Sequence, residues 1–232
     1  MSVQQIVERF SLPDDTEESL VGTDWHQRAI VNTYDALLDL AILTGAPWHV
    51  GNQLTLVAWA PDGSVWRPSP DIMVHPNAGP APRKEMVARD DGPPALVIEV
   101  ASESTWRNDV NALHGKAAGY LALGVRDYLV FDPTGAYLGV PCRGWQRSGA
   151  GAHDWKPAPD GRYHSRSLGV SFRAEGVFLR VYDRDGRPIA SREERLQEIA
   201  TLRAELAQLR QQNELTDSFP ATTENERGRI AA

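Results

Sequence analysis

Three features are scarce in this 232-residue chain, and each scarcity excludes a class of protein. Cys142 is the only cysteine, so an internal disulfide is impossible, and no group of cysteine and histidine has zinc-site spacing. No apolar run approaches the ~20 residues that a membrane span requires. Basic residues number 24 against 31 acidic ones, and the formal net charge of −7 excludes a uniformly basic nucleic-acid surface.

What remains is the composition of a soluble globular chain. With 41% hydrophobic residues, it can bury the core of one ordinary domain with some tail left over. The N-terminal stretch lacks the basic flank and apolar centre of a signal peptide. We therefore expect a cytoplasmic protein with no membrane partner, whose contacts with nucleic acid are local or mediated by a metal ion.

The first half of the chain predicts one long helix followed by short strands. Residues 1–21 form an acidic N-terminal segment, and apolar residues recur at helical spacing in residues 23–45. Residues 48–60 and 64–75 are rich in β-forming residues and flank a Pro-Asp-Gly turn signal, which predicts a hairpin. Residues 76–94 contain five prolines and are expected to form a long loop without an element of its own.

The second half predicts a strand, a helix and a strand in succession. Residues 93–102 read as a buried strand, residues 104–124 as a helix capped by Ser104 or Thr105, and residues 125–133 as another apolar strand. This order predicts a parallel crossover. Further strands are expected within residues 136–145 and 169–183.

The C-terminal part predicts a helix that needs a partner. Residues 191–212 are expected to form this helix, and residues 213–232 a polar, disordered tail. Four apolar residues of the helix follow the a and d spacing of a coiled coil over two heptads: Ile199, Leu202, Leu206 and Leu209. The chain is therefore expected to form a homodimer or another self-association through this helix.

The stretch PPALVIEVAS contains the most informative residue of the sequence. Glu99 interrupts the apolar run of a buried strand, and a buried, unpaired carboxylate costs several kcal/mol. Asp71, which follows Pro70 and begins another predicted strand, is a second carboxylate that can converge on it. Hard cations such as Mg²⁺ take one or two carboxylates and leave positions for a phosphate.

The helix predicted after Glu99 carries three further polar candidates. Asp109, Lys116 and Tyr120 have the spacing i, i+7 and i+11, which places them along one face of a continuous helix. A lysine on the face that covers the sheet can reach the two carboxylates. The structural alternatives are a salt bridge between Lys116 and Asp109 or a surface lysine whose aliphatic stem covers apolar surface.

These residues and their order resemble the Uma2 family of restriction-endonuclease-like proteins. The resemblance rests on PDIMV, PALVIEVASEST, the residues at 109, 116 and 120, and LGVRDYLVFDP, over about residues 22–135. It implies an α/β fold of the PD-(D/E)xK nuclease class, with a mixed sheet flanked by helices, over residues 22–190. It also implies cleavage of DNA that depends on Mg²⁺ or Mn²⁺.

The resemblance also implies roles for single residues. Asp71, Glu99 and Lys116 would be catalytic, with the metal held by Asp71, Glu99 and the backbone carbonyl of Val100. The usual motif places a lysine two residues after the second acid, where this chain has Ala101, and Lys116 of the helix would replace it.

Three residues would then support the site. Asp109 would position Lys116, Tyr120 would pack, and His26 matches a histidine found near the start of the family's first helix.

Two alternatives stay open at this point. Residues 142–167 contain five basic side chains interleaved with aromatic ones: Arg143, Arg147, Lys156, Arg162 and Arg166. This pattern suits binding of a phosphate backbone and unstacked bases. The alternative is a solvated loop whose tryptophans pack on the sheet. The whole chain is either a metal-dependent DNA endonuclease or a catalytically inactive, nucleic-acid-associated or scaffold module that self-associates through its C-terminal helix.

Overall fold

The structure is a computed structural model that describes residues 24–60, 63–149 and 151–217. Two compact units divide the chain between Ile189 and Ala190, and each is described by itself. The predicted N-terminal segment, residues 1–21, lies outside the described residues, as does the tail from residue 218 onward. Among the helices that are described, none has the length and apolarity needed to cross a bilayer.

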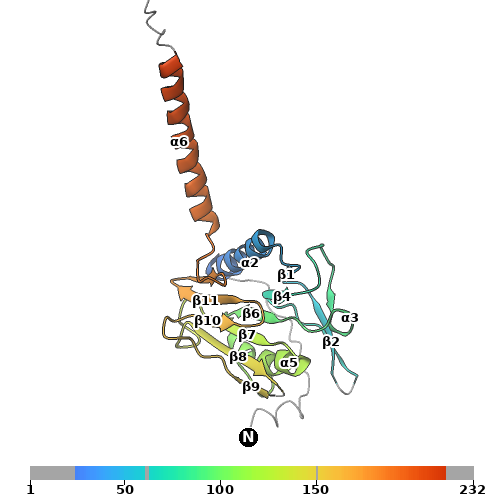
Figure 1. Cartoon of the computed structure of the whole chain (residues 1–232). Coiled ribbons are helices and arrows are strands. Elements are labelled where there is room, and N and C mark those ends of the chain that lie inside the picture. The colour runs from blue at the N-terminus through green and yellow to red at the C-terminus, as the bar shows by residue number, and fades with distance from the viewer. Residues whose placement is uncertain (1–23, 61–62, 150, 218–232) are drawn as a thin grey trace, which may run out of the picture. The chain divides into compact units, whose positions relative to one another are not determined.

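A mixed six-stranded sheet forms the centre of the first unit (Figure 1). Its strand order is β1-β4-β6-β7-β8-β9, and only the β6–β7 pair is parallel. The strands are β1 (His49–Asn52), β4 (Ile72–His75), β6 (Leu96–Val100), β7 (Asp127–Phe131), β8 (Cys142–Ser148) and β9 (Gly151–Asp154). The predicted mixed sheet and the parallel crossover after Glu99 are both confirmed.

Two three-stranded sheets flank the central one. The first, in the order β3-β2-β5, joins β3 (Val65–Trp66), β2 (Leu56–Trp59) and β5 (Met86–Val87). The second, in the order β10-β11-β12, joins β10 (Tyr163–Ser165), β11 (Val170–Glu175) and β12 (Phe178–Tyr182). β2 and β3 form the expected hairpin, whereas β1 and β4 on either side of it pair with each other in the central sheet.

The prediction of an element-free loop over residues 76–94 is wrong. Strand β5 pairs in parallel with β2, and the single-turn helix α3 (Ala88–Asp91) follows it directly. A carboxylate stabilises this turn, because Asp91 Oδ2 accepts the N–H of Val87 at 3.1 Å and its Oδ1 contacts Arg83 at 2.8 Å. A two-residue strand and one helical turn are too short for sequence periodicity to reveal them.

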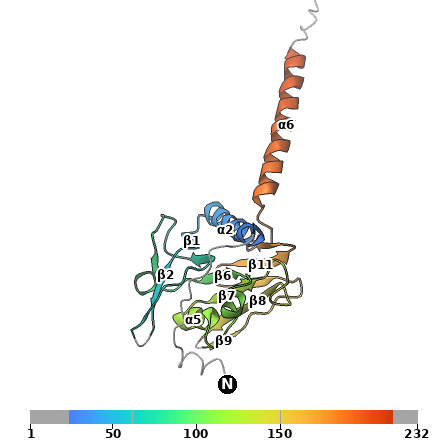
Figure 2. The ribbon, with the colours of Figure 1, turned by 180° about the vertical axis from the view of Figure 1, so that it is seen from behind.

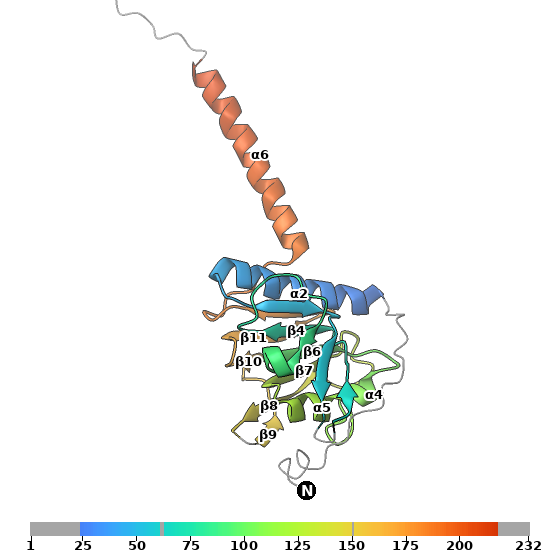
Figure 3. The same ribbon diagram turned by 90° about the vertical axis from the view of Figure 1, so that its right-hand side faces the viewer.

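Helices cover both faces of the central sheet (Figures 1 and 3), and Figure 2 shows the same layers from behind. Helix α2 (Asp24–Thr44), as predicted, packs on one face. The apolar core between this helix and the sheet includes Leu96, Ile98 and Val100 of β6. Helix α5 (Lys116–Leu123) packs on the other face, with Val97 and Ala101 in its core. Because side chains alternate along a strand, Glu99 projects to the α5 face.

The helix predicted over residues 104–124 is interrupted. It divides into the single turn α4 (Trp106–Asp109) and α5, and the Oδ1 atom of Asn111 between them accepts the N–H groups of Leu113 and His114 at 3.0 Å each. A side chain that binds nearby backbone groups in this way competes with helical hydrogen bonds. Thr105 holds the N-cap position of α4, but no side-chain cap bond is formed there.

The second unit contains helix α6 (Arg192–Asp217). A capping box begins it: Ser191 Oγ accepts the N–H of Glu194 at 3.2 Å, and Glu194 Oε2 accepts the N–H of Ser191 at 2.7 Å. The helix continues five residues beyond the predicted end at residue 212, so residues 213–217 are helical rather than part of a disordered tail.

Gly119 generates a test of the packing that holds α5 against the small sheet. A Cβ atom at this position would lie 2.6 Å from the Trp66 ring. We expect Gly119→Ala to lower the free energy of unfolding by about 1–3 kcal/mol, although alanine is the better helix former. Chemical denaturation measures this change.

The control for this experiment is the same substitution in a Trp66→Phe background. Phenylalanine lacks the three ring atoms that a Cβ at position 119 would meet. There, Gly119→Ala should be neutral or stabilising, and an equal loss in both backgrounds would contradict the close-contact explanation.

Candidate active site

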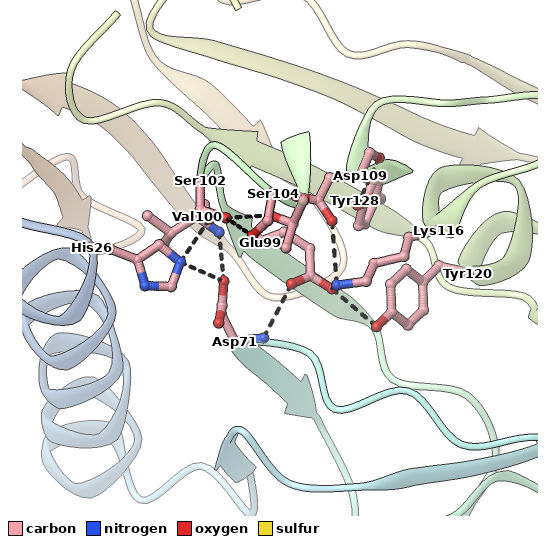
Figure 4. Close-up of polar contacts among 11 residues, drawn as sticks. His26, Asp71, Glu99, Val100, Ser102, Ser104, Asp109, Lys116, Tyr120 and Tyr128 are labelled. Atoms are coloured by element: carbon pink, nitrogen blue, oxygen red, sulfur yellow. Dashed lines mark hydrogen bonds and ion pairs between the residues drawn. The ribbon is translucent and has the colours of Figure 1, made fainter. Parts of the chain in front are cut away.

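The register of β4 against β6 brings the two predicted carboxylates together. The strands run antiparallel with Ile72 opposite Ile98, so Asp71 and Glu99 lie level with each other. Each carboxylate accepts a backbone N–H across the strand pair: Asp71 Oδ2 accepts the N–H of Val100 at 2.8 Å, and Glu99 Oε2 accepts the N–H of Asp71 at 3.4 Å (Figure 4). Asp71 is 13% exposed and Glu99 only 3%, so Asp71 lies on the solvent side of the pair.

His26, in the first turn of α2, reaches the same strand ends. Its Nε2 atom lies 2.9 Å from the carbonyl oxygen of Val100 and 3.6 Å from Asp71 Oδ2. A carbonyl oxygen can only accept, so Nε2 carries the proton in this contact. The Nε2 atom therefore lies between the Val100 carbonyl oxygen and Asp71 Oδ2 (Figure 4). The family resemblance assigns both of these groups to a metal ion.

Lys116 approaches Glu99 from the α5 face of the central sheet, whereas His26 comes from α2 on the other face. Its Nζ atom lies 3.6 Å from Glu99 Oε1 and 3.3 Å from Asp109 Oδ1, with only 9% of the side chain exposed. The lysine opens α5, and Asp109 closes α4. The predicted meeting of Asp109 and Lys116 is thus observed, but the turn between two helices produces it rather than one continuous helical face.

A hydrogen bond from Tyr120 restrains the carboxylate of Glu99. The Tyr120 hydroxyl donates to Glu99 Oε1 at 3.1 Å. Burial, together with the neighbouring charge of Glu99, raises the pKa of Tyr120 well above its usual value, so the phenol stays a neutral donor. The expectation that Tyr120 packs is met, and the hydrogen bond adds a polar contact.

Sequence reasoning missed Tyr128 and the aromatic row to which it belongs. The Tyr128 hydroxyl donates to the carbonyl of Asp109 at 2.9 Å and holds the end of α4 in place. Ring centroids are 4.9 Å apart between Trp66 and Tyr120, 5.3 Å between Tyr120 and Tyr128, and 5.8 Å between Tyr128 and Trp145. The available signal was strand alternation, because Tyr128 lies opposite Val97 and shares the face of Glu99.

Part of the basic stretch, residues 142–167, forms contacts within the fold rather than an open surface. Arg147 donates to the carbonyl of Leu121 at 2.6 Å, and Arg162 contacts Asp160 at 2.7 Å, so both form internal contacts. The aromatic residues of this stretch that would stack on bases are instead buried in the fold: Trp145, Trp155 and Tyr163. The remaining basic residues, Arg143, Lys156 and Arg166, are exposed.

The charge and donor set of the site fit a divalent cation. Three carboxylates, Asp71, Glu99 and Asp109, surround one lysine and one histidine, and such an excess of like charge favours a cation. Among the described residues, no three His, Cys, Asp or Glu side chains are placed to hold a metal by themselves. Mg²⁺ needs fewer, because one or two carboxylates suffice when waters, carbonyls and phosphate oxygens complete its shell.

The fold and the convergent acidic and basic side chains are those of a restriction-endonuclease-like protein. A family model described as Uma2, "Putative restriction endonuclease", matches residues 8–167. The chain therefore belongs to the Uma2 family, and a nuclease-like function follows in general terms. The predicted family and fold class are both confirmed.

Comparison with solved structures and curated proteins adds little to this assignment. One similar crystal structure is that of a "putative nuclease belonging to DUF820" from Anabaena variabilis, with 11% identity, a TM-score of 0.42, and coverage of 69% of this chain and 90% of the other. No curated protein matches the chain.

Asp109 gives the site a measurable pH dependence. Burial raises the pKa of its carboxyl group from 3.8 to about 6, although Lys116 opposes the shift. Between about pH 4 and pH 6 the folded protein retains a proton that the unfolded chain has released, so stability falls as pH rises through that window.

We expect Asp109→Asn to remove this effect. The unfolding free energy of the variant relative to wild type should increase by about 1 kcal/mol between pH 5 and pH 7. Urea denaturation at several pH values measures the difference, and other titrating groups cancel because both proteins contain them. A difference that stays constant with pH would refute the raised pKa.

Proposed function

We propose that this chain is a DNA endonuclease that hydrolyses phosphodiester bonds with a divalent cation, Mg²⁺ or Mn²⁺. The observation that carries the proposal is that Asp71 and Lys116 both contact the buried carboxylate of Glu99, although the three residues come from separate parts of the chain. Membership of the Uma2 family supports the same reaction class. A purely structural role explains the geometry less well, because Glu99 and Asp109 share the single ammonium group of Lys116 and Asp71 adds a third carboxylate.

Three groups at the ends of β4 and β6 would hold the cation. Asp71, Glu99 and the carbonyl of Val100 are the ligands we assign to the cation. When bound, a divalent cation supplies a water of lowered pKa and neutralises charge on the phosphate. The chain itself contributes fixed geometry, because Tyr120 anchors one oxygen of Glu99 and the N–H of Val100 anchors one oxygen of Asp71.

Lys116 would stabilise the negative charge that develops on the phosphate oxygens. An ammonium group held in a largely dry site is worth more there than in water, and it needs no reorganisation during the reaction. Asp109 and Glu99 contact its Nζ atom on two sides, which restrains the flexible side chain. Lys116 thereby replaces the lysine that the motif lacks at Ala101.

DNA is the substrate that we assign, and its backbone would be contacted locally. Arg143, Lys156 and Arg166 are exposed, whereas Arg147 and Arg162 are engaged within the fold. Because the net charge is −7, approach of a polyanion depends on such local basic groups and on the bound cation. Self-association through α6 belongs to the same proposal.

Cleavage of single-stranded, duplex and branched DNA in Mg²⁺ or Mn²⁺ tests the reaction. Glu99→Gln should reduce cleavage to the level seen with a chelator, and Lys116→Met should lower the rate on the order of 100-fold. Both substitutions keep side-chain length while they remove charge.

The exposed Asp90→Asn and Lys84→Met variants serve as charge-matched controls and should keep wild-type activity. Activity that survives both site substitutions would refute the assigned residues. Absence of cleavage on every substrate would favour the inactive scaffold instead.

His26 would contribute Nε2 as a further ligand once the Nε2 proton has moved to Nδ1 or to solvent, because a metal ion binds only an unprotonated imidazole nitrogen. This is a more direct role than the supporting one inferred from sequence. The nitrogen already lies between Asp71 and the Val100 carbonyl. Imidazole favours transition metals over Mg²⁺. We expect wild type to bind Mn²⁺ more tightly than Mg²⁺ without DNA, and His26→Ala to weaken Mn²⁺ binding by roughly tenfold or more while it changes Mg²⁺ binding less.

Titration calorimetry with each metal salt measures these affinities independently of catalysis. His114→Ala removes an exposed histidine and is the matched control. Equal losses for both metals in His26→Ala would reduce His26 to a hydrogen-bond donor that orients the Val100 carbonyl.

A further inference from the structure

Helix α6 carries an exposed apolar stripe along one side. Its members are about half exposed: Ile199 at 43%, Leu202 at 55%, Leu206 at 48% and Leu209 at 56%. Their spacing assigns Ile199 and Leu206 to position a and Leu202 and Leu209 to position d of two heptads. Each such side chain gains about 1.5–3 kcal/mol when it is fully buried, so a matching helix would stabilise the stripe.

We propose that the stripe binds the same stripe of a second copy of this chain, and that the two α6 helices pair in parallel and in register as a two-stranded coiled coil. The proposal goes beyond self-association in general, because it specifies the partner helix, its direction and its alignment. Charge, side-chain shape and one polar residue each support it.

The charges that flank the stripe select the parallel direction. With Ile199 at position a, Glu198 and Glu205 fall at g, and Arg203 and Arg210 fall at e. The next positions outward, Leu196 at e and Gln212 at g, are uncharged. In a parallel pair, each g residue faces the e residue five positions later on the other helix. Glu198 then faces the partner's Arg203, and Glu205 faces the partner's Arg210, in all four cross-helix positions.

An antiparallel pair would place like charges together. There g faces g and e faces e, so glutamate meets glutamate and arginine meets arginine, and such contacts are unfavourable. Arg203 has no acidic residue, and Glu205 no basic residue, three or four positions away in its own helix. Their opposite-charge partners along α6 therefore come from another helix rather than from neighbouring turns.

The residues of the stripe itself favour two strands in register. A β-branched residue at a with leucine at d favours dimers, and the first heptad has this pair at Ile199 and Leu202, whereas the second has leucine at both positions. Asn213 falls at the next a position, and it is exposed in α6. A single asparagine at a specifies register, because only an aligned partner asparagine can satisfy its amide.

A parallel pair has a consequence that rests on the proposed nuclease function. Each α6 is joined through its N-terminal end to the unit that ends at Ile189. Parallel pairing attaches two such units at the same end of the coiled coil, whereas antiparallel pairing attaches them at opposite ends of a helix about 39 Å long. Two active sites joined at one end suit cleavage of both strands of one duplex.

Solution mass tests the pairing without any catalytic readout. By light scattering at tens of micromolar, wild type should have twice the 25.6 kDa chain mass. Glu198→Lys with Glu205→Lys should be monomeric, and so should Arg203→Glu with Arg210→Glu, while an equal mixture of the two should restore the dimer. Glu193→Lys with Glu214→Lys changes the same charge on the outer face and should stay dimeric.

Disulfide capture tests the direction and the register. Ile199→Cys and Leu209→Cys are made separately, and the buried Cys142 stays in place because its pKa is raised to about 12. In the parallel dimer each variant links to itself in an oxidising glutathione buffer. In an antiparallel dimer position 199 faces position 209, so only the mixture would link. Outward-facing Gln208→Cys should not link in either case.

The outcomes separate this proposal from the nuclease proposal. A monomeric wild type, or linkage only in the mixture, overturns the parallel coiled coil whatever the activity. A parallel dimer without DNA cleavage keeps the coiled coil and sinks the nuclease. If both hold, the glutamate-to-lysine variant at positions 198 and 205 should nick supercoiled plasmid while wild type also linearises it, and equal linearisation by both would remove the two-strand consequence.

Discussion

A carboxylate in the middle of an apolar strand is the constraint on which the rest of the site depends. Glu99 is almost fully buried, and its neighbours along β6 belong to the two cores of the unit. An ionised group in that place is tolerated only when hydrogen bonds and opposite charge surround it. Tyr120 and Lys116, both of α5, and the backbone of Asp71 supply them from two other parts of the chain.

These partners divide the site into an inner and an outer half. The inner half, with Lys116 and Asp109, is packed beneath an aromatic row and is largely closed to water. The outer half, with His26 and Asp71, retains some exposure at the end of β6. The inner half therefore holds the lysine and Glu99 in fixed positions, while the outer half is the side of the site that solvent reaches.

Much of this arrangement could be anticipated from local pattern. The long helix α2, strand β6 and strand β7 follow from apolar periodicity, because each is long enough or apolar enough to show it. The break between α4 and α5 could not, because a single asparagine side chain decides it through contacts with two backbone N–H groups. The burial of Trp145 and Trp155 likewise depends on the cores against which they pack, which the basic stretch alone does not show.

The sequence by itself determined that Glu99 needed partners, and that an acid, a lysine and a histidine were available in an order typical of the Uma2 family. Local residue types and spacing carry that information, since burial cost and periodicity are local properties. Only the tertiary structure decided how they meet: the antiparallel register of β4 on β6 places Asp71, the turn after α4 aims Lys116, and the start of α2 brings His26 to the Val100 carbonyl. Strand register is set by contacts between distant segments, which no local pattern contains. The helix break depends on one local side chain, Asn111, that binds backbone N–H groups in competition with the helix, and apolar periodicity does not show such a competition.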